Sequence, residues 1–280
     1  MRCAPGQTLS GRVALVTGAT GSMGAAIAQR LAGEGAAVAG LGRTSDSGLR
    51  VARQIVAGGG RACFIRADVS REDQVRDAVA AAVESFGRLD VVVNAAAATE
   101  LLRGADELPV VDEPTEVFDR MMRVNLYGPF WTAKYAIPHM LRTGTGGAIV
   151  SISSISASRV DRSMPAYAAS KAGLEGLTRQ IATDYGEWGI RVNAIALGSI
   201  RSAETAHIHD DPVNGPARRR NRMIPQPGTV DDVAELVAYL ASPRSAFLTA
   251  AVVPLDGGAM SAYPAPVIAE AKSEQHKVRE

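Results

Sequence analysis

The sequence predicts an α/β protein: a doubly wound, mainly parallel sheet of seven strands with helices on both faces. Short apolar runs alternate with longer segments of helical periodicity along the chain. The runs are apolar at nearly every position, which is typical of strands that are covered on both faces. The chain has 280 residues, of which 46% are hydrophobic, and this is enough to bury one large core around such a sheet.

Each element is assigned from its length and its apolar pattern. The seven runs predicted as strands are short and nearly continuous, and they lie at residues 13–16, 37–41, 62–65, 89–93, 148–152, 191–195 and 251–255. The six segments predicted as helices carry apolar residues at helical spacing, and they lie at residues 25–33, 49–57, 71–86, 115–142, 166–186 and 230–241. Strands and helices in alternation predict right-handed crossovers between parallel strands.

The chain is predicted to form one domain, because no shift in composition marks a boundary inside it. Residues 1–262 are assigned to this domain, and residues 263–280 to a polar C-terminal tail. The segment 199–229 breaks the alternation after the carboxyl end of a predicted strand, where open α/β sheets bind their ligands. We therefore predict that this segment is a lid over the substrate.

Charge and composition exclude several classes of function. The net charge of +1 argues against nucleic acid as a partner, since phosphate binding usually leaves a basic excess. No stretch approaches the ~20 apolar residues of a membrane span, and no signal-peptide pattern opens the chain, so we expect a cytoplasmic protein. Cys3 and Cys63 are too few for a disulfide framework, and the four histidines form no metal-binding pattern with carboxylates, so no metal is expected.

A glycine-rich turn joins the first predicted strand to the first predicted helix. Glycine there allows a positive φ and a close approach to a pyrophosphate, which then lies at the N-terminus of the helix. A plain structural turn is the alternative, but the position between strand and helix favours a Rossmann-type dinucleotide site. The predicted cofactor contacts come from Gly18, Thr20, Gly21, Ser22, Met23 and Gly24.

A tyrosine and a lysine lie four residues apart on the predicted helix 166–186, so Tyr167 and Lys171 share one face. A phenol titrates near ~10, and a nearby cation favours the phenolate, which makes Tyr167 a candidate general acid or base. The pair alone is better explained as a buried tyrosine beside a surface lysine. The functional interpretation depends on what accompanies it, beginning with Ser154, thirteen residues before Tyr167.

With these motifs in this order, the sequence resembles the short-chain dehydrogenase/reductase superfamily, in its branch of about 250-residue single-domain enzymes. The resemblance covers roughly residues 9–260. Besides the glycine-rich turn and the set Ser154, Tyr167 and Lys171, the matching motifs are Asp68-Val69, Asn94-Ala95-Ala96-Ala97, Val124-Asn125-Leu126, Arg191-Val192-Asn193-Ala194-Ile195-Ala196-Leu197-Gly198 and Leu255-Asp256-Gly257-Gly258.

The resemblance implies an oxidoreductase that interconverts a carbonyl and a secondary alcohol of a small molecule by hydride transfer. It implies that Tyr167 passes a proton to or from the substrate oxygen, while Ser154 stabilises charge on that oxygen. Lys171 would lower the pKa of Tyr167 and hold the nicotinamide ribose, and Asn125 would hold a water that links Lys171 to solvent. The other implied cofactor contacts are Asp68 and Val69 beside the adenine, together with Asn94, Ala95, Ala96, Gly198, Ile200 and Ser202.

The chain departs from the family pattern at four places. Ser22 replaces the middle glycine of the turn, Ala95 to Ala97 replace an Asn-Ala-Gly sequence, Leu197 replaces a proline, and Ala250 replaces a glycine. The glycine spacing through Gly21 fits the longer epimerase and dehydratase branch instead. An NAD-using epimerase or dehydratase therefore stays open as an alternative, as does a dinucleotide-binding regulator without turnover. The intact Ser154, Tyr167 and Lys171 argue against that regulator.

Cofactor choice is predicted from the end of the second strand, where an acidic residue would bind the ribose hydroxyls of NAD(H). That position is Gly42, and Arg43 follows it. A guanidinium can bind a 2′-phosphate through two hydrogen bonds, so we predict NADP(H), with NAD(H) as the second possibility. The alternative is that Arg43 is a solvated loop charge.

The predicted helix 115–142 carries more apolar residues than one sheet-facing stripe needs. Some of them must face the sheet, and the alternative is that all of them do. The excess indicates a second buried face, and symmetric oligomers bury the same patch on each subunit. We therefore predict a homotetramer, with a dimer as the second choice.

Overall fold

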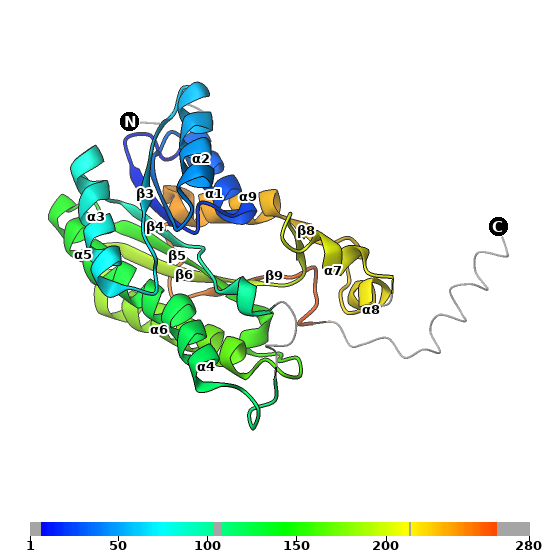
Figure 1. Cartoon of the computed structure of the whole chain (residues 1–280). Helices are drawn as coiled ribbons and strands as arrows, with labels where there is room; N and C mark the ends of the chain where they lie inside the picture. Colours follow the sequence, from blue (N-terminus) through cyan, green and yellow to red (C-terminus); the bar gives the residue numbers. More distant parts are fainter. Residues whose placement is uncertain (1–6, 103–107, 213, 262–280) are drawn as a thin grey trace.

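The computed structural model describes residues 7–102, 108–212 and 214–261. Its centre is a seven-stranded sheet in which every neighbouring pair is parallel, in the order β3-β2-β1-β4-β5-β6-β9 (Figure 1). The strands are β1 (Val13–Thr17), β2 (Ala37–Gly42), β3 (Arg61–Arg66), β4 (Val91–Asn94), β5 (Gly147–Ser154), β6 (Ile190–Leu197) and β9 (Val252–Leu255). This is the Rossmann-type α/β fold, and the prediction is confirmed.

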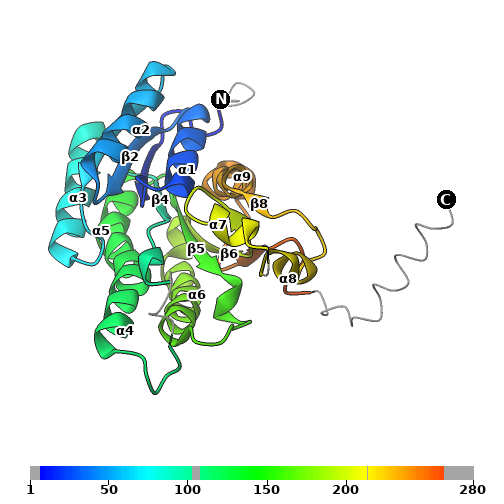
Figure 2. The same ribbon diagram turned by 45° about the vertical axis from the view of Figure 1, so that its right-hand side comes forward.

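Helices cover both faces of the sheet (Figures 1 and 2). One face carries α1 (Ser22–Gly33), α2 (Ser45–Ala57) and α9 (Val230–Ala241), and the other carries α3 (Glu72–Phe86), α5 (Gly128–Thr143) and α6 (Pro165–Tyr185). Strand β1 shows why its sequence is apolar throughout. Ala14 and Val16 pack into the core of the first face, whereas Val13 and Leu15 pack into the core of the second.

The segment predicted as one helix over residues 115–142 is more complex. Helix α4 (Thr115–Met122) leads into a π-helical turn (Arg123–Tyr127), which continues directly as α5. Turns of this kind often occur at functional sites, and this one holds Asn125. Periodicity alone could not show the extra residue that widens the helix.

The predicted lid also has secondary structure of its own. It contains β7 (Ile200–Arg201), α7 (Ala206–Asp210), α8 (Asn214–Arg220) and β8 (Gly228–Thr229), and β7 pairs with β8 in parallel. Both views place α7 and α8 beyond the carboxyl end of β6, next to β8 (Figures 1 and 2). The tail predicted at residues 263–280 lies outside the described residues, as does Cys3.

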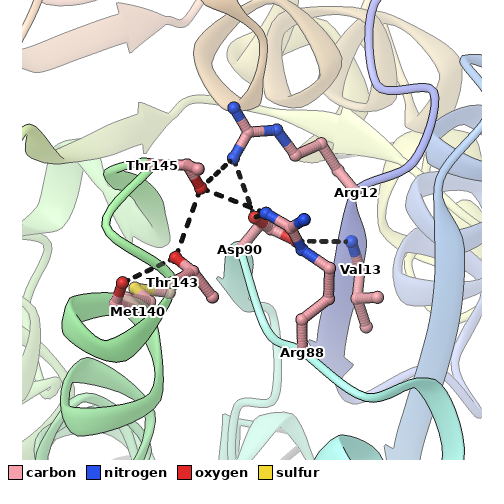
Figure 3. Close-up of polar contacts among 7 residues, drawn as sticks. All are labelled: Arg12, Val13, Arg88, Asp90, Met140, Thr143 and Thr145. Carbon is pink, nitrogen blue, oxygen red and sulfur yellow. Dashed lines mark hydrogen bonds and ion pairs between the residues drawn. The ribbon is translucent and has the colours of Figure 1, made fainter.

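A polar cluster closes the opposite, amino edge of the sheet (Figure 3). The buried carboxylate of Asp90, just before β4, accepts hydrogen bonds from Arg12 at 2.8 Å, from Arg88 at 2.6 Å and from the Val13 N–H at 2.9 Å. Burial alone would raise the pKa of Asp90, but Arg88, Arg12 and the Val13 N–H outweigh it and lower that pKa. The cluster joins β1, β4 and the turn before β5, where Thr145 contacts both guanidinium groups.

Among the residues that the structure describes, none of the helices combines the length and the apolar character needed to cross a membrane. The cytoplasmic location stays a prediction.

Candidate active site

A cavity of about 450 Å³ lies at the carboxyl ends of the strands, beneath the first part of the lid. This is where open α/β sheets bind ligands, because the loops there diverge and leave a crevice. The structure brings most of the predicted site residues together on its walls: Gly18, Thr20, Gly21, Ser22, Met23, Gly24, Arg43, Asp68, Val69, Ala95, Ala96, Ser154, Tyr167, Lys171, Gly198, Ile200 and Ser202.

The glycine-rich turn is shaped by close backbone contacts. Gly18 has a φ of +72°, and a Cβ at this position would lie 2.8 Å from the backbone nitrogen of Ala96. A Cβ at Gly24 would overlap the carbonyl oxygen of Gly18. Only glycine fits at these two positions. The turn thereby presents the first N–H groups of α1 to the cavity, as a pyrophosphate-binding turn requires.

Two regular elements carry the predicted catalytic residues. Strand β5 ends at Ser154, whose Oγ accepts the Ser156 N–H at 3.1 Å. Helix α6 places Tyr167 and Lys171 one turn apart, and the Lys171 Nζ lies 5.6 Å from the centroid of the Tyr167 ring. The Nζ also donates to the Ile152 carbonyl at 2.7 Å, which fixes the lysine against β5.

Burial dominates the titration of this pair. Desolvation raises the pKa of Tyr167, and a hydrogen bond with Ser154 opposes it. Desolvation also lowers the pKa of Lys171 from 10.5 to about 8, although the charge of Glu175 works to raise it. The pKa of Tyr167 therefore lies above its ordinary value, because desolvation exceeds the effect of Ser154. That Lys171 lowers this pKa during the reaction stays a prediction.

A buried carboxylate under the site was missed by the sequence analysis. Glu175, which is 8% exposed, lies one helical turn beyond Lys171 on α6 and accepts a hydrogen bond from Ser153 Oγ at 2.9 Å. Ser153 adjoins both Ile152, which accepts from Lys171, and Ser154. The i, i+4 spacing from Lys171 was the available signal, since it places both side chains on one face of the helix.

Two predicted residues lie behind the cavity wall. The buried side chain of Asn125 accepts the Ala98 N–H at 3.0 Å and donates to Ser170 Oγ at 3.1 Å. The buried side chain of Asn94 donates to Ser151 Oγ at 3.2 Å and accepts from Thr132 Oγ1 at 2.7 Å. Asn94 therefore joins β4 to β5 and α5, whereas Asn125 joins the π-helical turn to α6 and to the segment after β4. The contacts predicted for the two asparagines with water and cofactor stay predictions.

At the far end of the cavity, charged residues surround the position predicted for the adenine ribose. Nη1 of the exposed Arg43 lies 3.3 Å from Oε1 of Glu100, and Nη2 of Arg120, on α4, lies 3.1 Å from the same oxygen. Asp68 accepts the Ser70 N–H at 2.9 Å, which shapes the turn after β3. Arg43 and Asp68 were predicted from their motifs, whereas Glu100 and Arg120 were not, because they come from separate segments of the chain.

A carboxylate from the lid reaches the turn as well. Glu204 accepts the Ser22 N–H at 3.0 Å and also accepts a short hydrogen bond from the Ser22 hydroxyl. These two residues are 182 positions apart in the chain. Desolvation works against the charge, but the hydrogen bonds from Ser22, together with those from the Ser202 side chain and the Glu204 backbone, outweigh it and lower the pKa of Glu204 to about 2. The substitution of the family glycine by Ser22 was the only local signal of this contact.

Comparisons with known proteins decide the family. A family model described as enoyl-(acyl carrier protein) reductase matches residues 18–260. A short-chain type dehydrogenase/reductase from Mycobacterium ulcerans has a similar structure, with a TM-score of 0.86 and 30% identity over 95% of this chain and 96% of that one. The chain belongs to the short-chain dehydrogenase/reductase family. Members of this family are oxidoreductases that bind nicotinamide dinucleotides.

Two further relatives give chemical context to this short-chain dehydrogenase/reductase. Cis-4-hydroxycyclohexanecarboxylate dehydrogenase from Sinomonas cyclohexanicum is 37% identical over 90% of this chain and 98% of its own length. A blue fluorescent protein from a metagenomic library, solved in complex with NADPH, has a TM-score of 0.81 and 34% identity, over 90% of this chain and 99% of that one.

No metal-binding cluster is found in the part of the chain that the structure describes. No three histidine, cysteine, aspartate or glutamate side chains there are grouped so that they could hold a metal ion. His207 and His209 both lie on the short helix α7.

Proposed function

We propose that this short-chain dehydrogenase/reductase uses NADP(H) to interconvert a carbonyl group and a secondary alcohol of a small molecule. The observation that carries the proposal is the convergence of Ser154, Tyr167 and Lys171 on the cavity that the glycine-rich turn also lines. The relative from Sinomonas cyclohexanicum supports the substrate class, because its name describes the oxidation of a hydroxyl group on a carbon ring.

Each catalytic residue has a role that its position supports. The Ser154 hydroxyl donates a hydrogen bond to the substrate oxygen and stabilises the charge that develops there. Tyr167 gives its proton to that oxygen in reduction and takes it back in oxidation. Its raised pKa keeps the phenol protonated at neutral pH, which suits the reducing direction. The chemistry that the bound dinucleotide supplies is hydride transfer.

Lys171 supports both steps from the same face of α6. Its ammonium group stabilises the tyrosinate that remains after proton transfer, and it would hold the hydroxyls of the nicotinamide ribose. The proposal also includes Asn125, which would hold a water between Lys171 and solvent so that Tyr167 can be reprotonated.

A panel of ketones and secondary alcohols, with NADPH or NADP⁺ and absorbance followed at 340 nm, tests this function. Net oxidation or reduction of the cofactor with matching product is the expected result. Product without net change of the cofactor would instead identify an epimerase or dehydratase. Cofactor binding without product from any member of the panel would identify a regulator without turnover.

The preference for NADP(H) rests on Arg43, whose guanidinium lies beside the adenine end of the cavity. A 2′-phosphate there would compete with Glu100 for Arg43 and the nearby Arg120, and a phosphate offers more charge than the carboxylate. The blue fluorescent protein that binds NADPH supports the same choice.

The variant Arg43→Gln tests the cofactor preference. We expect it to weaken NADPH binding about tenfold and to leave NADH binding nearly unchanged, since only NADPH has the 2′-phosphate. Arg50→Gln, at an exposed arginine of α2, is the matched control. A wild-type enzyme that prefers NADH would refute the role of Arg43. The substitution Gly42→Asp is a poorer test, because the Cβ of the new side chain would lie 2.5 Å from Thr20 Cγ2.

We also propose that the enzyme is a homotetramer, with a dimer as the second choice. Tyr127, at the end of the π-helical turn, and Phe130, in the first turn of α5, support it, because these aromatic side chains remain exposed. Met121 of α4 and Trp131 of α5 are buried in the single chain, so they belong to its core. Light scattering that gives a mass near the 29.2 kDa of one chain would refute both assemblies.

A further inference from the structure

Glu204 lies at the N-terminus of α1, where a dinucleotide-binding turn holds the pyrophosphate of its cofactor. In a dinucleotide-binding turn, the pyrophosphate lies at the N-terminus of the first helix and accepts hydrogen bonds from its backbone N–H groups. Here the Glu204 carboxylate accepts the N–H of Ser22, the first residue of the twelve-residue helix α1. Both residues line the same cavity as Tyr167 and Lys171. An internal anion is therefore bound where the negative charge of the cofactor is expected.

We propose that Glu204 is an internal competitor of the cofactor pyrophosphate, and that the pair Ser22 and Glu204 sets the affinity of this enzyme for its dinucleotide. The inference rests on the proposed function only in requiring a nicotinamide dinucleotide as cofactor. The two oxygens of the Glu204 carboxylate accept from the N–H and the hydroxyl of Ser22, and the Ser202 side chain also hydrogen-bonds to the carboxylate. Glycine at position 22, as in the family pattern, would remove the hydroxyl donor.

Desolvation opposes the charge, but the hydrogen bonds from Ser22, from the Ser202 side chain and from the Glu204 backbone outweigh it and lower the pKa of Glu204 to about 2, so the carboxylate is charged at neutral pH. Two negatively charged groups cannot share these N–H groups, because close like charges repel strongly in a partly desolvated cleft. Binding of the pyrophosphate must therefore displace Glu204, and the measured affinity is reduced by the fraction of molecules in which Glu204 holds the turn.

The backbone around Glu204 is held in place, so the displacement requires only the side chain to move. The Ser202 N–H donates to Thr205 Oγ1 at 2.9 Å, and the Thr205 hydroxyl donates to the Ile200 carbonyl at 2.8 Å. These bonds fix the turn on both sides of Glu204. The backbone of Ile200 and Ser202, which are predicted to contact the cofactor, can thus stay in place while the carboxylate rotates away and releases the hydroxyl groups of Ser22 and Ser202.

The variant Glu204→Gln tests the competition by direct binding. We expect the dissociation constant of NADPH, followed by its fluorescence in the absence of substrate, to fall about tenfold because the competing charge is gone. NADH should gain equally, since both cofactors contain the pyrophosphate, and the ratio of the two constants should not change. Ser22→Gly should give a smaller gain of about threefold, because the backbone N–H of residue 22 remains for Glu204.

Asp210→Asn is the matched control, because it also removes one negative charge from the lid. Asp210 pairs with Arg201 through two hydrogen bonds of 2.8 Å on the exposed side of α7. We expect the dissociation constant of NADPH to stay within about twofold of the wild-type value. A general effect of lid charge would instead tighten binding in Asp210→Asn as much as in Glu204→Gln.

A second measurement separates competition from a merely structural contact. Thermal unfolding of the cofactor-free Glu204→Gln variant should begin at a lower temperature, because the contact with Ser22 is weakened, while the rise in melting temperature on adding NADPH should be larger than in wild type. If the contact were only structural, Glu204→Gln would lower the melting temperature of the cofactor-free protein but would not enlarge the rise caused by NADPH.

If wild type binds NADPH and Glu204→Gln binds it no more tightly, this inference is overturned and the proposed function stays intact. Weaker binding in Glu204→Gln would do the same. If neither NADPH nor NADH binds to wild type or to either variant, the proposed function and this inference both fail.

Discussion

The two edges of the central sheet each bury a charged side chain, and they stabilise it in different ways. At the amino edge, Asp90 is 1% exposed and lies within hydrogen-bond distance of two arginines and a backbone N–H (Figure 3). At the carboxyl edge, Lys171 is 2% exposed, and its Nζ donates to the neutral carbonyl of Ile152. The buried Glu175 is close enough to act on Lys171 by its charge, but it bonds to Ser153.

The pKa values of Asp90 and Lys171 are both lowered, but for different reasons. Although desolvation opposes them, the two arginines and the Val13 N–H hold the pKa of Asp90 low. The charged form is therefore favoured in the folded state, and Asp90 stabilises the fold. Desolvation brings the pKa of Lys171 down to about 8, close to physiological pH, where a small change of surroundings alters its charge. The amino edge therefore fixes the fold, and the carboxyl edge keeps a charge available for chemistry.

The largest effect is expected at the carboxyl edge, from Tyr167→Phe. This variant removes the hydroxyl that transfers the proton and leaves the ring in place, so turnover should be abolished while cofactor affinity stays nearly unchanged. Steady-state rates and a fluorescence titration with NADPH measure the two quantities. Retention of more than about a tenth of the wild-type rate would show that another group acts as the acid and base.

Ser154→Ala should reduce the rate less severely. The loss of one hydrogen-bond donor to the substrate oxygen is expected to cost about 2–4 kcal/mol of transition-state stabilisation, measured as kcat/KM. Ser153→Ala is a useful comparison, because this neighbouring hydroxyl bonds to Glu175. Equal losses in the two variants would contradict a specific role of Ser154 at the substrate.

At the amino edge, Asp90→Asn should lower stability and leave the catalytic rate of the folded enzyme unchanged. Removal of the charge weakens the bonds from both arginines and is expected to cost about 2 kcal/mol, since the arginines are about a third exposed and can be rehydrated. Chemical denaturation measures the loss. Asp77→Asn, at an exposed carboxylate that pairs with Arg76, should leave the denaturation midpoint nearly unchanged.

The stability that Asp90 adds should also depend on pH in a defined direction. Because its pKa is lower in the folded protein than in the unfolded chain, the contribution is complete above the unfolded pKa and is lost as the pH falls through the folded pKa. The difference in stability between wild type and Asp90→Asn should thus shrink in acid. A difference that stays constant at low pH would contradict the assignment.

Features that depend on local sequence patterns could be predicted, whereas contacts between distant segments could not. The strands could be predicted because they depend on local periodicity. Ser154, Tyr167 and Lys171 could be predicted because their order and short spacing resemble the motif of a known family. The contact of Ser22 with Glu204 joins distant segments, and no periodic pattern connects them. The π-helical turn at Arg123–Tyr127 depends on one extra residue within an otherwise helical pattern, which apolar spacing does not resolve.

The smallest effect, and the sharpest test of the carboxyl edge, is expected from Glu175→Gln. The negative charge of Glu175 raises the pKa of Lys171 against the effect of desolvation, so its removal should lower that pKa further below about 8. Lys171 would then lose its proton at lower pH. If turnover requires the ammonium form, the alkaline limb of the pH profile of kcat should move to lower pH by roughly half a unit to one unit.

Ser153→Ala separates the charge of Glu175 from its position. This variant removes the hydrogen bond to Glu175 but keeps the carboxylate, so the alkaline limb should stay near its wild-type pH even if kcat falls. Glu175→Asp, which retains the charge, should restore most of the wild-type profile. Equal profiles in wild type and Glu175→Gln would mean that Glu175 only packs against β5. The buried charge of Lys171 would then be set by desolvation alone, and the carboxyl edge would have no counterpart to the arginines that hold Asp90.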